Sequence, residues 1–158
     1  REKFQDRLII GAGPVLDSET ARHAILHNAQ FIIAPNFSQE VAVMCNRYQI
    51  PYAPGCTTLT EALQALEAGA AFIKAFPISD FYGPRLVSVF KTPIPYMPIL
   101  ASGGIDLKNL KDYVLRGVDC CGFGSLLTKG SREEIAANAR SIRTLIDEAR
   151  QEMQTTAG

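Results

Sequence analysis

The chain has 158 residues, the size of one domain, and its 47% hydrophobic and 20% charged residues are typical of a soluble globular protein. Sixteen basic residues balance sixteen acidic ones, so the formal net charge is zero. That balance argues against a nucleic-acid groove or an anionic membrane surface and favours a small, neutral or anionic metabolite as the ligand.

The four cysteines predict neither a zinc site nor a disulfide scaffold. Cys45, Cys56, Cys120 and Cys121 include no C-x-x-C pair, so we expect reduced structural thiols. No apolar run reaches the roughly 20 residues of a membrane-spanning helix. The charged segment 1–6 lacks an apolar signal core. These features predict a cytoplasmic protein.

Short β-branched or apolar runs alternate with helical patterns from one end of the chain to the other. Such alternation predicts βα units and a parallel sheet. The expected strands are 8–11, 31–34, 52–55, 72–76, 96–101 and 120–124. The chain would therefore contain about six βα units.

Cap residues and glycines mark the helices between these strands. Thr58 and Glu61 have the spacing of a capping box. Gly69 and Gly117 stand where a helix needs a left-handed terminator. Apolar residues recur on one face of segment 131–153 and predict an amphipathic closing helix.

Two features favour a (β/α)₈ barrel over an open doubly wound sheet. Several expected strands end in small, proline or polar residues, and in a barrel these ends converge on one ligand mouth. The last two strands end in glycine turns, at 102–104 and 122–125, each followed by a helix. Barrels frequently bind phosphate in this region through backbone N–H groups.

Lys74 lies inside segment 71–77, which otherwise has the pattern of a buried strand. A buried ammonium is costly unless it is paired or used. Burial lowers a lysine pKa and exposes the free amine, the form that attacks a carbonyl to make a Schiff base. Lys74 is therefore a candidate nucleophile. The alternative is an edge-strand lysine whose stem lies along apolar surface while its charge stays in water.

His23 and His27 are four residues apart on an expected helix. This spacing can bind a metal if a third ligand joins the pair. No third ligand stands out in the sequence, so we expect surface or interface packing for both histidines.

Six segments, in this order and spacing, resemble the 2-keto-3-deoxy-6-phosphogluconate/4-hydroxy-2-oxoglutarate aldolase family: 11–16, 31–36, 50–55, 72–77, 102–105 and 124–125. The resemblance implies a class I aldolase on a (β/α)₈ TIM barrel, usually a homotrimer. Such an enzyme cleaves a 2-keto-3-deoxy-6-phospho sugar acid or 4-hydroxy-2-oxoglutarate into pyruvate and an aldehyde. Residues 1–158 would form a single domain, the carboxyl-terminal part of the barrel.

The resemblance also implies roles for individual residues. Lys74 matches the family's Schiff-base lysine, Phe76 is a close neighbour of it, and Pro35 matches a residue of the pyruvate-binding wall. No metal or other cofactor is implied, because the protonated imine is itself the electron sink. The substrate's carboxylate and phosphate would bind the two glycine turns, at Ser102, Gly103, Gly104, Gly124 and Ser125.

The chain departs from the family's pattern in several places. The family's catalytic glutamate and a nearby basic residue precede the segment that begins this chain, and six units are two short of eight. We expect the carboxyl-terminal part of a longer barrel rather than a six-unit relic, because a relic would expose unpaired strand edges. Pro14 replaces a threonine and Asn36 a frequent glycine. The aromatics of segment 78–84 would either line the mouth or pack a neighbouring subunit.

Two rival functions remain open. A non-catalytic or degenerate barrel that binds a phosphate ligand would keep the glycine turns without using Lys74. A barrel resembling thiamine phosphate synthase would need Mg²⁺, and the sequence offers no clear carboxylate pair for that ion.

Overall fold

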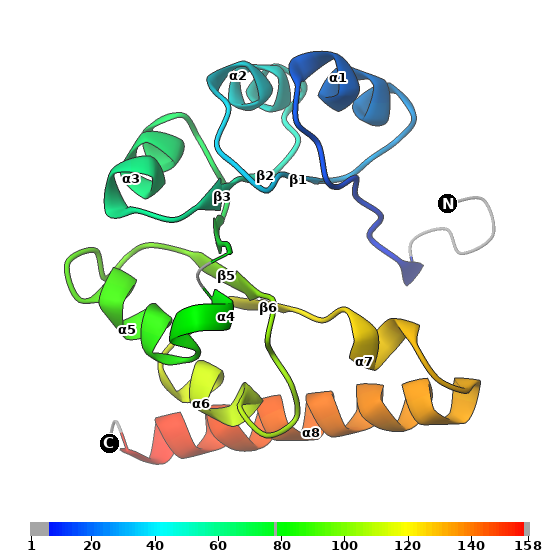
Figure 1. Cartoon of the computed structure of the whole chain (residues 1–158), viewed down its shortest axis with the longest axis vertical. Helices are drawn as coiled ribbons and strands as arrows, with labels where there is room; N and C mark the ends of the chain where they lie inside the picture. Colours follow the sequence, from blue (N-terminus) through cyan, green and yellow to red (C-terminus); the bar gives the residue numbers. More distant parts are fainter. Residues whose placement is uncertain (1–6, 78, 157–158) are drawn as a thin grey trace. The chain divides into compact units, whose positions relative to one another are not determined.

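The computed structural model describes residues 7–77 and 79–156, and the chain divides into two compact units. The first unit ends at Phe76 and the second begins at Pro77. Helices and strands alternate within each unit (Figure 1). The predicted α/β organisation is therefore present in both.

The strands of the first unit run parallel to one another. β1 pairs with β2 and β3 pairs with β4, both in parallel. Backbone hydrogen bonds from Ala34 N to Ala53 O (3.1 Å) and from Ala71 N to Tyr52 O (2.9 Å) continue the pairing on both sides of the β2 chain. In chain order the elements are α1 (Ser18–Leu26), β1 (Ile32–Ile33), α2 (Gln39–Tyr48), β2 (Tyr52–Ala53), β3 (Gly55–Cys56), α3 (Leu59–Glu67) and β4 (Ile73–Ala75).

Helices cover one face of these strands. Ile32 and Ala34 are buried in a core that also contains Ala21 of α1 and Val41 of α2. Figure 1 shows α1 and α2 side by side next to β1 and β2. Because successive strand side chains point to opposite faces, the residues between these buried positions face away from the helices.

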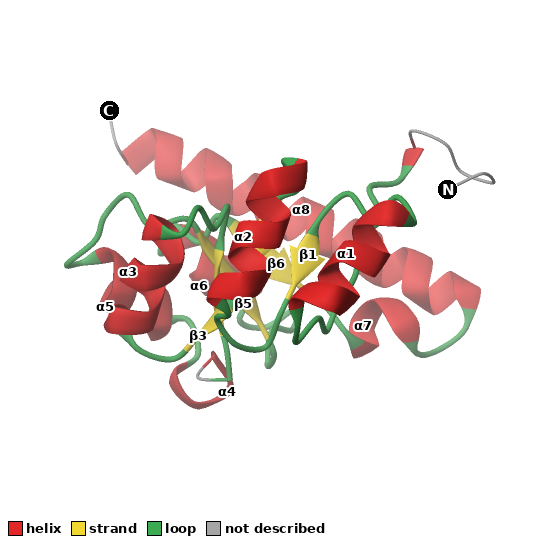
Figure 2. Ribbon diagram, turned by 90° about the horizontal axis from the view of Figure 1, so that it is seen from above, coloured by secondary structure: helices red, strands yellow, loops and turns green. Residues whose placement is uncertain are grey.

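The second unit contains one parallel strand pair and a long closing helix. β5 pairs with β6, and Ser102 lies opposite Gly122. α8 is one continuous helix (Figure 2) that packs against α6 and α7, so the predicted closing helix is confirmed. In chain order the elements are α4 (Ser79–Tyr82), α5 (Arg85–Lys91), β5 (Ile99–Ser102), α6 (Leu110–Leu115), β6 (Cys120–Gly122), α7 (Ser125–Thr128) and α8 (Arg132–Thr156).

The strand predicted at 8–11 is wrong as a regular strand. The segment follows β1 through the Ala12–Ile32 bridge and a hydrogen bond from Gln30 N to Ile10 O (2.8 Å). Within the described residues it pairs on that side only, and Ile9 is 75% exposed. The apolar run predicted an extended segment but could not show that its pairing with β1 would be limited to a single bridge.

The strand predicted at 52–55 is two strands, because a proline interrupts it. Pro54 has no N–H and cannot donate to a neighbouring strand. Its carbonyl still accepts a hydrogen bond from Lys74 N (2.9 Å). In the strand registers, Tyr52 and Ala53 pair with β1, and Gly55 and Cys56 pair with β4.

The predicted helix boundaries are confirmed at several positions. Thr58 Oγ1 accepts from Glu61 N (3.2 Å) while the Glu61 carboxylate accepts from Thr58 N (2.8 Å), which completes the capping box. Gly69 and Gly117 have φ values of +86° and +83°. The described part of the chain contains no helix with both the length and the apolar character of a membrane span.

Replacing Thr58 with alanine should lower the free energy of unfolding by about 1 kcal/mol, since an orphan N–H at the start of α3 loses its acceptor. Urea denaturation measures this loss, and Thr60→Ala on the same exposed turn is the matched control.

Hydrogen bonds from the Thr57 and Thr58 N–H groups hold the pKa of Glu61 below its usual range. The carboxylate's stabilising contribution is thus present above the usual glutamate pKa and is lost as the pH falls through the lowered value. An equal loss in Thr58→Ala and Thr60→Ala would contradict this role of the box.

Candidate active site

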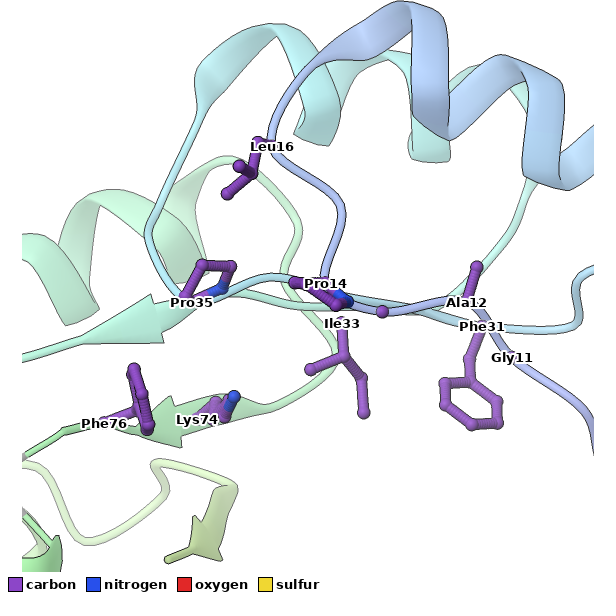
Figure 3. A pocket seen from close by; sticks show the side chains of 10 residues that line it. Gly11, Ala12, Pro14, Leu16, Phe31, Ile33, Pro35, Lys74 and Phe76 are labelled. Carbon is purple, nitrogen blue, oxygen red and sulfur yellow. The ribbon is translucent and has the colours of Figure 1, made fainter.

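An open cleft of about 610 Å³ lies in the first unit, on the strand face that the helices leave uncovered (Figure 3). Lys74 and Phe76 contribute from β4 and its end, and the extended segment 11–14 with Leu16 contributes another wall. The remaining lining comes from the β1 region, at Phe31, Ile33 and Pro35.

Strand alternation explains which residues reach the cleft. Ile73 and Ala75 are fully buried, while Lys74 between them and Phe76 beyond them line the cleft. Phe31 and Ile33 flank buried Ile32 in the same way, and Figure 3 shows both side chains pointing to one side of β1. The two-residue period of a strand therefore separates the core from the site.

Glycine 55 allows the strands around the cleft to approach closely. It lies directly opposite Lys74 in the β3–β4 register. A Cβ at Gly55 would collide with the backbone carbonyl of Pro35. Glycine at this position lets the segment that contains Pro35 lie close to β3, the strand that pairs with β4 at Lys74.

The Lys74 amine is half-buried and lacks a compensating carboxylate. Its Nζ lies 4.2 Å from the centroid of the Phe76 ring. Within the described residues, Nζ takes part in no ion pair or hydrogen bond. Burial lowers the pKa of Lys74 from its usual value of 10.5. The contact with Phe76 acts in the opposite sense, because an aromatic face stabilises the ammonium.

Neighbouring titratable groups shift in the opposite sense. Burial raises the pKa of Cys56, on the strand beside β4, to about 12, and that of Tyr52 also to about 12. Both groups are thereby kept protonated and unreactive near neutral pH. Desolvation favours the uncharged form of every group. For cysteine this is the protonated thiol, whereas for lysine it is the deprotonated amine, the nucleophilic form.

The glycine turns lie in the second unit, at the carboxyl ends of neighbouring strands. Ser102 ends β5, and Gly103 and Gly104 follow with φ values of +92° and +65°, which a residue with a Cβ rarely adopts. Gly124 precedes α7, whose first residue is Ser125. The pairing of Ser102 with Gly122 puts the two turns at the same edge of the strand pair.

The predicted site residues thus form two groups. Lys74, Pro35 and Phe76 share the cleft of the first unit. The five turn residues Ser102, Gly103, Gly104, Gly124 and Ser125 belong to the second unit. Pro14, which stands where the family has threonine, lines the cleft, and so do Leu16, Phe31 and Ile33, which the sequence did not predict as site residues. For the last two, the alternate spacing 31, 33, 35 was the available signal.

Other candidates lie outside both groups. The rings of His23 and His27 are 4.3 Å apart, and His27 Nδ1 lies 2.8 Å from the His23 carbonyl oxygen. No cluster of three metal-binding side chains occurs among the described residues. In the segment 78–84, residue 78 lies outside the described residues, while Phe81 is 82% exposed and Tyr82 60% exposed.

Residues 1–142 match the family model of the KDPG and KHG aldolases. The chain belongs to this aldolase family. It is 36% identical over 132 residues to 2-dehydro-3-deoxy-6-phosphogalactonate aldolase of Escherichia coli (strain K12), an alignment that covers 83% of this chain and 64% of the relative. A solved structure described as native KDPGal matches with a TM-score of 0.88 and 35% identity, over 95% of this chain and 74% of that one. The predicted family is therefore confirmed.

A second solved structure, KDPG aldolase from Legionella pneumophila, matches with a TM-score of 0.73 and 28% identity, over 94% of this chain and 69% of that one. It holds pyruvate captured at low pH as a covalent carbinolamine intermediate. The family's barrels are of the (β/α)₈ type, and the parallel βα units of this chain confirm the predicted class, as part of such a barrel. The chain spans 64% and 51% of the length of the first two curated relatives that it matches.

The pKa of Lys74 should lie below 10.5 and that of Lys111 above it. A single sample therefore provides both the test and its internal reference. The hydrogen bond from Lys111 to Glu152 raises the pKa of Lys111, whereas burial lowers that of Lys74. NMR of isotope-labelled lysine side chains measures both pKa values.

The same shift predicts how stability depends on pH. Because the folded-state pKa of Lys74 is lowered, the unfolded chain binds more protons between that pKa and the usual one, so this residue makes stability rise with pH in that window. Titration of Lys74 at or above 10.5 would contradict the desolvation argument.

Proposed function

We propose that this chain carries the imine-forming lysine of a class I aldolase, which cleaves a 2-keto-3-deoxy-6-phospho sugar acid or 4-hydroxy-2-oxoglutarate to pyruvate and an aldehyde. The observation that supports it best is Lys74, a half-buried and uncompensated amine on an apolar cleft in a member of an aldolase family. No metal or organic cofactor takes part in the proposed chemistry.

The neutral amine of Lys74 adds to the C2 ketone of the substrate and forms a carbinolamine, which loses water to give an iminium. A base takes the proton of the C4 hydroxyl, the C3–C4 bond breaks, its electron pair moves toward the iminium nitrogen, and the C4 end leaves as the aldehyde. Protonation of the resulting enamine at C3 and hydrolysis release pyruvate and restore the amine. The carbinolamine held by the Legionella pneumophila enzyme contains pyruvate and corresponds to the last covalent intermediate of such a cleavage, before pyruvate leaves.

The remaining predicted residues have binding roles in this proposal. Pro35 and Phe76 form apolar walls beside Lys74 and hold the pyruvate half of the substrate. The two glycine turns bind the substrate's carboxylate and phosphate through N–H groups, because backbone without Cβ lets an anion approach closely. Their residues are Ser102, Gly103, Gly104, Gly124 and Ser125.

The reaction also needs a group that moves protons. Among the described residues that line the cleft, Lys74 is the one titratable side chain. We therefore assign proton transfer to a carboxylate outside this lining. The proposal further includes a single domain over residues 1–158, a homotrimeric assembly and a cytoplasmic location.

Incubation with pyruvate and sodium borohydride tests the proposal without requiring turnover. Borohydride delivers hydride to the imine carbon, so the lysine gains the mass of pyruvic acid less one oxygen atom. Peptide mapping should place this adduct on Lys74, and Lys74→Arg should abolish it while Lys111→Arg, on an exposed helix face, should not. No adduct on a sample shown to be folded by circular dichroism would reject the aldolase and favour a barrel that only binds a phosphate ligand.

A further inference from the structure

The side chain of Asn109 holds the Gly103–Gly104 turn of the second unit. Its Nδ2 donates to the carbonyl oxygen of Gly104 (2.7 Å), and its Oδ1 accepts from the N–H of Asp106 (3.0 Å). These two bonds lie on either side of Ile105, which is buried. One partly buried side chain therefore fixes the two peptide groups that flank Ile105.

Asp106 fixes the position of Asn109 in return. The Asp106 carboxylate oxygen Oδ1 accepts from the N–H groups of Lys108 (2.8 Å) and Asn109 (3.0 Å). Asp106 and Asn109 thus cap each other before α6, in the manner of a capping box. The Asn109 amide adds an N–H donor that a carboxylate lacks, and this donor is the group that reaches Gly104.

The orientation of the Gly104 carbonyl decides where the next N–H points. The Gly104–Ile105 peptide is trans, so its C=O and N–H point in opposite directions, and the Ile105 N–H is directed away from Asn109. Among the residues that the structure describes, none accepts a hydrogen bond from the N–H of Gly103, Gly104 or Ile105. Successive N–H groups in a turn can form a concavity that binds anions. These three donors are therefore available to a ligand.

We infer that Asn109 is a positioning residue, which holds the turn at 103–105 in the conformation that binds an anionic oxygen group of the substrate, a carboxylate or a phosphate. This inference rests on the proposed function, which assigns the substrate's anionic groups to the glycine turns. Glycine has more conformational freedom to lose than any other residue, and here two glycines are adjacent. A hydrogen bond that removes this freedom before the ligand arrives reduces the entropic cost of binding. Asn109 acts through the backbone and needs no contact with the ligand.

The test is a titration of the isotope-labelled chain with inorganic phosphate at constant ionic strength, followed through the amide NMR signals of Gly103, Gly104 and Ile105. A second titration uses lactate, a carboxylate that has no ketone and therefore cannot form an imine with Lys74. At least one of the two anions should shift these signals to saturation. The two affinities then show whether the turn prefers a phosphate or a carboxylate.

Asn109→Ala should weaken the binding of the preferred anion about fivefold, the usual effect of one hydrogen bond. Asn46→Ala is the matched control, because Asn46 Nδ2 also donates to a backbone carbonyl, that of Ala68 (2.8 Å), but lies in the first unit. It should leave the affinity at the turn unchanged. Asn109→Ser serves if Asn109→Ala fails to fold, since its oxygen ends one bond short of both partners while the start of α6 keeps a polar side chain.

The outcomes separate this inference from the proposed function. Equal affinities in the wild type and Asn109→Ala, or an equal loss in Asn109→Ala and Asn46→Ala, would overturn the positioning role. So would signals at 103–105 that neither anion shifts in protein that forms the pyruvate adduct on Lys74, and the imine chemistry would then stand. Folded protein that forms no pyruvate adduct, but whose turn binds an anion in an Asn109-dependent manner, would overturn the proposed aldolase and retain the positioning role.

Discussion

The two-residue alternation of the parallel strands in the first unit is the constraint on which the candidate site depends. Ile73 and Ala75 face the helices, so Lys74 between them must face the cleft. A shift of the β4 register by one residue would exchange the amine for a core side chain. The β3–β4 pairing, which sets Lys74 opposite Gly55, therefore determines both the packing of the core and the position of the Lys74 amine.

Desolvation then gives that position its chemistry. The cleft wall is apolar, and no carboxylate among the described residues compensates the Lys74 amine. The same effect raises the pKa of the buried thiols Cys45 and Cys56. A single physical cause thus shifts the Lys74 amine toward its neutral form and the two buried cysteines toward their thiol form.

Residues without side-chain chemistry set the shape around the reactive group. Gly55 allows Pro35 to approach, and Pro54 lies between the pair of residues in register with β1 and the pair in register with β4. In the second unit, Gly103 and Gly104 take up left-handed conformations directly after β5. Backbone that lacks a Cβ or an N–H is thus concentrated at the carboxyl ends of the strands, where ligands of this fold class bind.

Local patterns in the sequence determined the order of βα units, the capping box at Thr58 and the closing helix, because each depends on residues within a few positions of one another. They also singled out Lys74, since a charge inside an apolar strand is visible in the sequence itself. Only the tertiary structure decided that segment 8–11 is not a regular strand, that Pro54 divides one strand into two, and that Ile33 faces the same cleft as Lys74. Those outcomes depend on which distant segments become neighbours, and pairing between segments about twenty residues apart leaves no signature in either segment alone.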